Sequence, residues 1–448
     1  EDLWTTFPNG SFGENGGTSM AAPIVSGGAA LLKTQFPAYN NLQIAALLQA
    51  TADNLNALNP SYIDKIGKGR INLFNGVSAT APQFLGLTSH IATDNNNNNF
   101  LFGDTILIEA FFENYLDPIT ATTVTLSTSS PFVNILDGTT NLPALGTLAT
   151  ASNSADRFKV EVLNGAAVNE AVVFKAVITN GTYTNTEYFT IALNPDYINL
   201  VENFVSTTIT SNGRIGFTDA SNTLGLGFAY NGKQLLYEAG LMIGRATDRV
   251  SDGIRGDVGQ DDDFTAEQYV GFHPPYVSAL DLYSNFGDYT EPKAVNVFVK
   301  QFSHAYAGDK YIIVVYNIAN VGLAPIANVH AGIFADWDID TAAFNKAGYD
   351  ASRKLGYVHS LGNNTVYAGI QLLSSENANN YSLDLDGTSG VSANGGFTTS
   401  EKYETLTTSR ISAGGTLGAD VAHVVSSSSF NLGGQESKTI AFAILAGD

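Results

Sequence analysis

The sequence predicts a mainly β protein that begins with a short α/β segment. Helical periodicity is confined to residues 1–80, whereas short alternating apolar stretches separated by Gly, Pro, Asn and Asp follow from Pro82 onward. Only 14% of the residues are charged, so Asn, Thr, Ser and Gly must supply most of the polar surface, as is typical of β-rich secreted proteins. The 448 residues exceed one ordinary core, and we expect three domains, at 1–80, 81–198 and 199–448.

The sequence of residues 1–80 predicts a strand, a turn, a glycine-rich loop and two helices, in that order. We expect a strand over residues 3–7, a turn at residues 8–10 and then the loop. A helix is predicted over residues 20–36, ending near Pro37. A second helix is predicted over residues 42–53, with Asn40 or Asn41 as its cap.

Residues 81–198 predict a small immunoglobulin-like sandwich. The expected strands lie at residues 100–113, 121–126, 157–163, 170–179 and 183–192. A polar loop is expected at residues 94–99, and Asn194–Pro195–Asp196 marks the end of the domain.

Residues 199–448 predict a large two-sheet sandwich. Asn231–Gly232 between two apolar stretches is a type I′ turn signal. Residues 295–299 are expected to pair with residues 311–315 across a turn at residues 307–309, and the last strand is expected at residues 439–445.

Charge and cysteine content exclude several classes of function. The chain has 21 basic and 42 acidic residues, a net charge of −21, which repels nucleic acids and anionic membranes. There is no cysteine, so disulfides, thiolate metal sites and a cysteine nucleophile are excluded. The longest apolar run, around residues 20–32, is shorter than the roughly 18 residues of a membrane span. No signal peptide is visible, and we interpret the sequence as a fragment or a processed piece.

Residues 13–23, GENGGTSMAAP, contain a candidate nucleophile. Acyl-transfer chemistry needs an exposed serine beside N–H groups that stabilise an oxyanion, and the start of a helix supplies both. Ser19 is placed there, after Gly16 and Gly17, whose backbone can approach a substrate closely. Pro23 is tolerated if it lies within the first helical turn.

This stretch resembles the catalytic serine motif of the subtilisin-like serine peptidases. The family pattern Gly-Thr-Ser-Met-Ala-x-Pro stands here as Gly17–Thr18–Ser19–Met20–Ala21–Ala22–Pro23, and Gly67–Lys68–Gly69–Arg70–Ile71–Asn72 resembles the segment that closes the catalytic domain. Ile24 stands where the family often has His. The resemblance covers about residues 1–80 and implies that Ser19 is the nucleophile, supported by Gly17, Thr18, Met20 and Pro23. Two other interpretations are the nucleophile elbow of an α/β-hydrolase and a small-residue turn that enters a core helix.

The other members of a catalytic triad are missing from the expected places. The family has its Asp and His before the serine, yet all six histidines follow Ser19, and Asp2, Asp53 and Asp64 match no catalytic position. We therefore expect the chain alone to be inactive and an upstream segment to supply Asp, His and an oxyanion-hole Asn. The complete protein is then a secreted or cell-surface bacterial serine endopeptidase that acts on protein or peptide substrates and requires no cofactor for catalysis. Its β domains would brace the enzyme, orient substrates or attach it to a surface. The rival interpretation is a structural or adhesion module that carries a vestigial peptidase fragment.

Asp336, Asp338 and Asp340 are candidate calcium ligands. At positions i, i+2 and i+4 they share one face of a strand, where neighbouring carboxylates repel unless a cation lies between them. The alternative is a solvated strand face or loop. Residues 261–263 and 384–387 are weaker candidates, and the abundant Tyr and Phe after residue 200 predict either a core or a sugar-binding platform.

Overall fold

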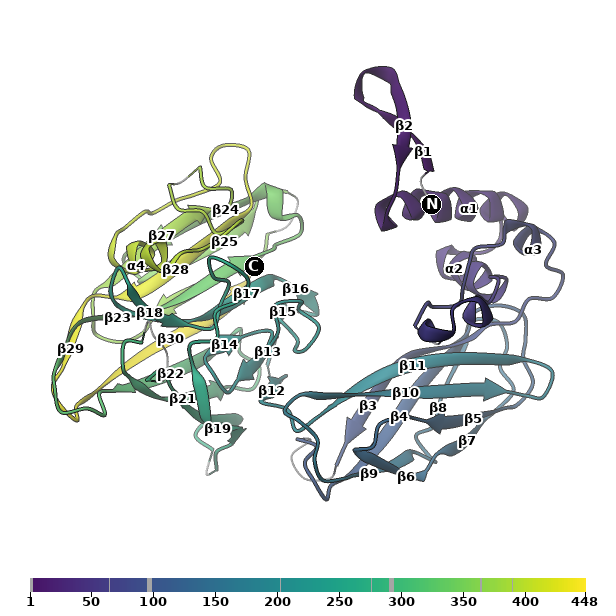
Figure 1. Cartoon of the computed structure of the whole chain (residues 1–448), viewed down its shortest axis with the longest axis horizontal. Helices are drawn as coiled ribbons and strands as arrows, with labels where there is room; N and C mark the ends of the chain where they lie inside the picture. Colours follow the sequence, from purple (N-terminus) through teal and green to yellow (C-terminus); the bar gives the residue numbers. More distant parts are fainter. Residues whose placement is uncertain are drawn as a thin grey trace. The chain divides into compact units, whose positions relative to one another are not determined.

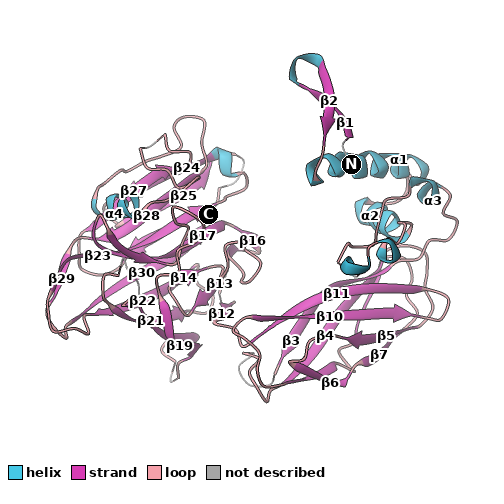
Figure 2. Ribbon diagram, in the orientation of Figure 1, coloured by secondary structure: helices cyan, strands magenta, loops and turns pink. Residues whose placement is uncertain are grey.

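The chain folds into two compact units, which we call unit 1 (Glu1–Pro195) and unit 2 (Asp196–Asp448). The computed structural model describes residues 3–63, 65–94, 99–201, 203–274, 276–289, 294–362, 365–388 and 390–448. Strands predominate in both units (Figure 1; Figure 2), so the mainly β prediction is confirmed. Unit 1 holds both segments expected as the first two domains, and unit 2 begins at Asp196, against an expected start at residue 199.

Unit 1 begins with a hairpin and three helices. Strand β1 (Leu3–Phe7) pairs with β2 (Ser11–Asn15) across a turn in which Asn9 has a φ of 66° and Gly10 a φ of 72°. The prediction that a loop follows the turn directly is wrong, because residues 11–15 pair with β1. The helices and short 3₁₀ turns are α1 (Thr18–Gln35), α2 (Asn41–Ala50), α3 (Leu73–Val77), η1 (Pro8–Gly10), η2 (Asn56–Leu58) and η3 (Pro60–Tyr62). No described helix has both the length and the apolar character that crossing a membrane requires.

Helix α2 begins at a capping box. The Gln43 N–H donates to Asn40 Oδ1 at 2.9 Å, and the Asn40 N–H donates to Gln43 Oε1 at 3.0 Å. These reciprocal bonds satisfy two N–H groups that the first turn would leave without acceptors. Of the two caps considered, Asn40 is therefore the one that α2 uses.

The remainder of unit 1 is a sandwich of two antiparallel sheets around one core. The first sheet consists, in spatial order, of β11 (Thr184–Leu193), β10 (Glu170–Thr179), β5 (Thr122–Ser127) and β7 (Thr139–Leu142). The second consists of β3 (Leu85–Thr93), β4 (Thr105–Asn114), β9 (Phe158–Val162) and β6 (Val133–Asp137), with β8 (Ala149–Ser152) beside β4. Ile106 and Ile108 of β4 share a buried cluster with Val172 and Phe174 of β10, so the two sheets face each other.

All five strands predicted for this sandwich are present, with one shortened. Residues 100–104 form a turn before β4, in which the Leu101 N–H donates to Asp104 Oδ2 at 2.7 Å. The sequence did not predict β3, β6, β7 and β8. Strands β6, β7 and β8 are four or five residues long and too short for a periodic pattern. Strand β3 has nine residues, but its pairing with β4 is irregular between Leu87 and Ser89. Of the expected polar loop at residues 94–99, residues 95–98 lie outside the described residues.

The helical segment is anchored to the sandwich within unit 1. Leu32 of α1 and Leu47 of α2 share a buried cluster with Phe84 and Leu116. The Lys68 ammonium donates to Asn185 Oδ1 at 2.7 Å and to Glu187 Oε1 at 3.0 Å on β11, and also to the Thr186 carbonyl oxygen.

Two large antiparallel sheets form most of the described part of unit 2. The first is an eleven-stranded sheet of β16 (Lys233–Gln234), β15 (Phe228–Tyr230), β13 (Val205–Thr210), β14 (Arg214–Ile215), β17 (Leu236–Ala246), β23 (Ile326–Trp337), β28 (Val421–Ser427) and β27 (Ala378–Asp384), with β12 (Tyr197–Leu200), β18 (Arg249–Asp252) and β29 (Phe430–Leu432) attached to β13, β17 and β23. The second is an eight-stranded sheet of β19 (Thr265–Phe272), β20 (Leu280–Gly287), β21 (Phe298–Ala305), β22 (Tyr311–Ala319), β30 (Ser437–Gly447), β26 (Tyr367–Leu372), β25 (Leu355–Ser360) and β24 (Asn345–Asp350). Ile333 of β23 and Val314 of β22 belong to one buried cluster, so the predicted two-sheet core is confirmed.

A helix that the sequence did not predict covers the eleven-stranded sheet. Helix α4 (Thr399–Thr407) places Leu406 in a second buried cluster with Met242 of β17 and Phe334 of β23. Leu241 and Ile243, the neighbours of Met242, belong to the large core instead, so β17 is buried on both faces. A further 3₁₀ turn, η4 (Ala342–Phe344), follows β23.

The hairpins of unit 2 are present, one of them with a different register. Asn231 and Gly232 have φ values of 49° and 77°, as the predicted type I′ turn requires, and β30 contains the predicted last strand. The predicted pairing of residues 295–299 with residues 311–315 is wrong: Ala305 pairs with Ile312, and Val299 pairs with Ile318. Residues 295–297 precede the strand because the Asp288 carboxylate accepts the N–H groups of Val295 and Val297 at 2.7 Å.

Candidate active site

Ser19 is exposed and is the second residue of α1. The helix cap is Gly17, with φ 116° and ψ 173°, a conformation that residues with a β carbon rarely adopt. A β carbon on Gly17 would meet no atom within 4 Å, so the need for glycine is conformational rather than steric. Gly17 therefore fixes where the helix starts and, with it, where the Ser19 hydroxyl lies.

Backbone N–H groups beside Ser19 are available to a ligand. The N–H groups of Met20 and Ala21 donate to the Gly17 carbonyl oxygen at 3.1 and 3.3 Å. Those of Thr18 and Ser19 precede them and have no acceptor within the helix. Together with the positive end of the helix dipole, these two groups can stabilise a developing oxyanion.

Pro23 lies in the second turn of α1, not in the first turn as expected, because the helix begins at Thr18. Proline has no N–H, so the carbonyl oxygen of Ser19, four residues earlier, lacks the usual helical hydrogen bond. The helix nevertheless continues to Gln35.

The two peptidase-like motifs meet in the fold. Gly28 of α1 lies so close to the second motif that a β carbon there would be 2.8 Å from Ile71 Cδ1 and 2.7 Å from Leu73 Cδ2. Asp53 holds this second motif: Arg70 Nη2 donates to Asp53 Oδ2 at 2.9 Å, and Asn72 Nδ2 donates to Asp53 Oδ1 at 2.8 Å. These bonds lower the pKa of Asp53, which serves as a structural anchor; Asp2 and Asp64 lie outside the described residues.

Each of the six histidines has a packing or hydrogen-bond partner within its own unit. Burial against Phe189 lowers the pKa of His90, the histidine of unit 1. In unit 2, buried His423 accepts a hydrogen bond from Trp337 Nε1 at 3.0 Å, and burial lowers its pKa to about 3. The other contacts within unit 2 are His273 with Tyr283, His304 with Asp281, His330 with Tyr403 and His359 with Tyr367. Among the described residues of unit 1, its histidine, His90, has no hydrogen bond to Ser19.

One histidine–aspartate pair in unit 2 has the geometry of the acid–base half of a triad. His304 Nδ1 lies 2.8 Å from Asp281 Oδ1. The nearby Ser278 hydroxyl, however, donates to the Asp281 carboxylate and to the Leu280 carbonyl oxygen. This trio therefore lacks the serine–histidine bond that activates a nucleophile.

Comparison with known proteins assigns the first segment. Residues 3–73 match the subtilase family model. Subtilisin E of Bacillus subtilis (strain 168) is 42% identical over 71 residues, which are 16% of this chain and 17% of subtilisin E. Residues 3–73 are a subtilase segment. An extracellular serine protease of Serratia marcescens is 41% identical over 71 residues, 6% of its length, and subtilisin Savinase of Lederbergia lenta is 42% identical over 58 residues, 22% of its length.

The subtilase segment is thus similar to serine peptidases. Much of its apolar surface is exposed. Trp4 and Phe12 of the hairpin are 75% and 71% exposed, and Phe74 of α3 is 77% exposed. Helix α1 carries apolar residues around its circumference, yet only Gly28 and Leu32 are buried. A helix that is apolar on all sides is normally covered on all sides.

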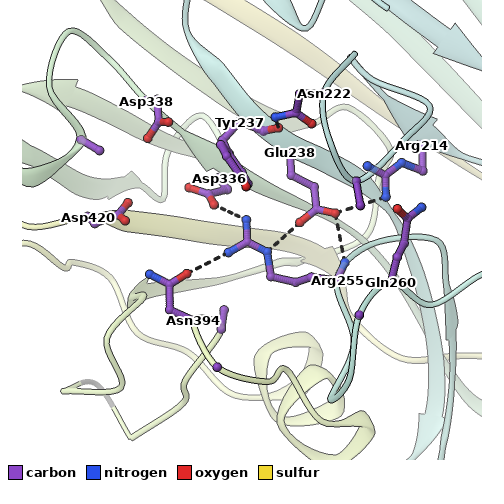
Figure 3. Close-up of a pocket in the computed structure, with 15 residues that line it drawn as sticks. Arg214, Asn222, Tyr237, Glu238, Arg255, Gln260, Asp336, Asp338, Asn394 and Asp420 are labelled. Carbon is purple, nitrogen blue, oxygen red and sulfur yellow. Dashed lines mark hydrogen bonds and ion pairs between the residues drawn. The ribbon is translucent and has the colours of Figure 1, made fainter. Parts of the chain in front are cut away.

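A polar pocket of about 440 Å³ in unit 2 contains two of the three predicted metal ligands (Figure 3). Arg255 lies at its centre: Nε donates to Glu238 Oε2 at 2.7 Å, and Nη2 forms an ion pair with Asp336 Oδ2. Arg214, which is 1% exposed, donates to the other Glu238 oxygen at 3.2 Å. Asp338 and Asp420 line the same pocket.

The expectation that Asp336, Asp338 and Asp340 share a face is wrong for Asp340. Strand β23 ends at Trp337, and Asp340 has a φ of 58°, so the alternation of a strand does not extend to it. Asp420 takes its place: carboxylate oxygens of Asp336, Asp338 and Asp420 lie within 4.8 Å of one another. No local pattern around residue 420 signals this, because the pairing of β23 with β28 creates the proximity.

The environment of these carboxylates opposes their ionisation. Burial, together with the charges of Asp420 and Asp338, raises the pKa of Asp336 to about 8 against the opposing effect of Arg255. Burial and Asp420 raise the pKa of Asp338, and burial raises the pKa of Asp420.

The weaker candidate at residues 261–263 belongs to a second acidic cluster, formed by Asp252, Asp261 and Asp263. The fully buried Lys402 ammonium donates to Asp252 Oδ1 at 2.7 Å and to Asp261 Oδ2 at 2.8 Å. A cation from the protein itself thus contacts two of these carboxylates. Burial is the main reason that the pKa of Asp252 rises to about 6 and that of Asp263 to about 7.

At the other weak candidate, Asp384 pairs with Arg410 at 2.9 Å, and Asp386 accepts the Thr388 hydroxyl at 2.9 Å. The aromatic side chains of unit 2 are divided between its core and its surface. Tyr316, Phe286 and Phe442 are buried in the core, whereas Tyr237, Tyr269 and Tyr367 are 45%, 44% and 45% exposed. The core prediction therefore holds for the buried aromatic side chains, and the sugar-binding platform stays a prediction.

Proposed function

We propose that this chain is the serine-bearing rear portion of a secreted subtilisin-like serine endopeptidase. The observation that carries the proposal is an exposed Ser19 at the start of α1, inside a segment that matches the subtilase family. The matched stretch spans 17% of subtilisin E, so activity and substrates are inferred for the complete protein rather than for this chain.

In this proposal Ser19 attacks the scissile carbonyl of a protein or peptide substrate and forms an acyl-enzyme, which water then releases. The N–H of Ser19 stabilises the oxyanion from the helix start. The base, its orienting Asp and a side-chain donor to the oxyanion come from subtilase sequence outside this chain. The chain alone is then inactive, since all six of its histidines follow Ser19, whereas the family has its Asp and His before the serine.

The exposed apolar surface of the subtilase segment supports this arrangement. Ile24 and Leu31 of α1 are 46% and 48% exposed, a costly arrangement unless another part of the protein covers them. The remainder of a subtilase domain would cover this face and bring the triad partners to Ser19. The sandwich of unit 1 and the two sheets of unit 2 would then stabilise the enzyme or bind substrate or a surface. The Serratia marcescens relative, an extracellular protease, is compatible with secretion.

Active-site labelling tests the proposal. The natural secreted protein is treated with a serine-directed fluorophosphonate, and the labelled peptide is mapped by mass spectrometry. We expect label on Ser19, loss of label in Ser19→Ala, and unchanged labelling in Ser26→Ala. Ser26 is a matched control because it is exposed on the same helix and its hydroxyl is bonded to the Ala22 carbonyl oxygen. Folded protein without label on Ser19 would instead favour a structural or adhesion module with a vestigial peptidase segment.

A further inference from the structure

Asp336, Asp338 and Asp420 form an acidic cluster in unit 2, where β23 ends and β28 begins. Strand β23 pairs with β28 in a register that joins Asp336 to Ala422, and continuing this antiparallel register sets Asp338 opposite Asp420. Like charges directly opposite each other destabilise a sheet unless something neutralises them. When all three carboxylates are ionised, the cluster therefore needs a counter-charge.

The three carboxylates are spaced for one ion. Oxygens from all three lie within 4.8 Å of one another. Two ligands on opposite sides of a calcium ion, each at about 2.4 Å, are about 4.8 Å apart, so one Ca²⁺ can contact all three side chains.

A buried oxygen without a partner points to a ligand. Asp336 is 3% exposed, and its Oδ2 is paired with Arg255, whereas its Oδ1 is buried and has no hydrogen-bond partner. Figure 3 shows this second oxygen on the side of Asp338 and Asp420, away from Arg255. Asp420 Oδ1 is likewise buried without a hydrogen-bond partner. Such carboxylate oxygens are costly unless a cation or a donor reaches them.

The charge of the pocket also favours a divalent cation. The charged residues that line the pocket are Arg214 and Arg255 on the one hand and Glu238, Asp336, Asp338 and Asp420 on the other, so the pocket has a formal charge of −2. Arg255 forms ion pairs with Glu238 and Asp336. Among the described residues, no basic side chain forms an ion pair with Asp338 or Asp420. At the second acidic cluster, by contrast, the Lys402 ammonium already lies between two carboxylates.

We propose that Asp336, Asp338 and Asp420 bind one calcium ion, which crosslinks the end of β23 to the start of β28. The open pocket leaves room for water to complete the coordination sphere. Calcium fits better than magnesium because Asp336 is held by Arg255 and cannot adjust to the short, regular octahedron that Mg²⁺ requires.

Calcium titration of the 448-residue chain tests this site independently of peptidase activity. We expect isothermal titration calorimetry to show one Ca²⁺ site, with a Kd of about 1 mM or tighter, and Ca²⁺ to raise the melting temperature of unit 2. Asp338→Asn and Asp420→Asn should each weaken binding at least about tenfold and remove the thermal shift. Both side chains are partly exposed, so if one variant fails to fold, the other still tests the site.

Asp340→Asn is the matched control. It removes the same charge two residues from Asp338, and asparagine tolerates the φ of 58° at this exposed position. Calcium binding should therefore be unchanged in Asp340→Asn. Three results would each overturn the proposal. The first is no calcium binding at Ca²⁺ concentrations several times higher than about 1 mM, and the second is equally tight binding of Mg²⁺. The third is undiminished calcium binding in both Asp338→Asn and Asp420→Asn.

Discussion

Gly69 lies against the backbone of Asp53 so closely that a β carbon on residue 69 would be 1.9 Å from the Asp53 carbonyl oxygen. The two segments are joined there, since the Asp53 N–H donates to the Arg70 carbonyl oxygen at 2.8 Å and the Arg70 N–H donates to the Asp53 carbonyl oxygen at 3.0 Å. Gly69 also has a φ of 119°, which residues with a β carbon avoid. Glycine at this position is thus required by space and by conformation, and it holds the second motif of the subtilase segment in place.

Gly69→Ala should destabilise the subtilase segment by about 2 kcal/mol or more, because it adds a backbone clash to left-handed strain. Gly67→Ala is the control: Gly67 has a φ of 61° but open space around it, so only the strain of about 1 kcal/mol applies. Hydrogen–deuterium exchange of α1 and α2 measures both effects. Equal exchange in the two variants would contradict the steric role of Gly69.

Lys402→Met should destabilise unit 2 by about 3–5 kcal/mol, because it leaves the buried Asp252 carboxylate without its cation. Lys310 also pairs with an aspartate, Asp448, at 2.6 Å, but it is 47% exposed, so Lys310→Met should change stability little. Urea unfolding followed by tryptophan fluorescence provides the comparison, since Trp337 is fully buried in unit 2 whereas Trp4 is largely exposed. Similar losses in the two variants would show that burial of the ammonium does not matter.

Unit 2 should become less stable as the pH rises from about 4 toward 7 through the titration of Asp263. Its pKa is raised to about 7, mainly by burial and by the charge of Asp252, so the folded state binds a proton in this range that the unfolded state has released. The raised pKa values of Asp252 and Asp336 act in the same direction, so Asp263→Asn should reduce the pH dependence of the melting temperature without abolishing it. Asp262→Asn, at the exposed neighbouring position, should leave this pH dependence unchanged. An undiminished slope in Asp263→Asn would contradict the role of Asp263.

Leu31→Glu and Leu32→Glu should have different effects on stability, because the two residues lie on the exposed and the buried side of α1. Leu32 is fully buried, so a glutamate there should cost more than about 3 kcal/mol in the isolated chain. Leu31 is 48% exposed, and the same change should cost less than about 0.5 kcal/mol. In the complete secreted protein, however, Leu31→Glu should lower fluorophosphonate labelling of Ser19 if the proposed remainder of the domain covers this face. Full labelling would mean that Leu31 stays exposed.

The parts of the fold that could be predicted depend on local interactions. The start of α1 follows from Gly17, the start of α2 from the reciprocal bonds of Asn40 and Gln43, and the Asn231–Gly232 hairpin from two residues that tolerate positive φ. The register of β21 and β22 could not be predicted from the sequence. Strand β21 continues from Val299 to Ala305, and this longer strand pairs regularly with β22 in a register other than the predicted one. Helix α4 has a capping box at Thr398 and Glu401, but only its packing on the eleven-stranded sheet makes nine residues helical.

By itself the sequence determined the mainly β class, the serine motif and the position of Ser19 at a helix start, since each depends on residues close together in the chain. Only the tertiary structure decided that Asp420, rather than Asp340, joins Asp336 and Asp338, and that Lys402 lies buried between Asp252 and Asp261. The physical reason is that these groups meet through strand register and helix packing. Residues distant in sequence then share a low-dielectric environment, which no spacing within the chain reveals.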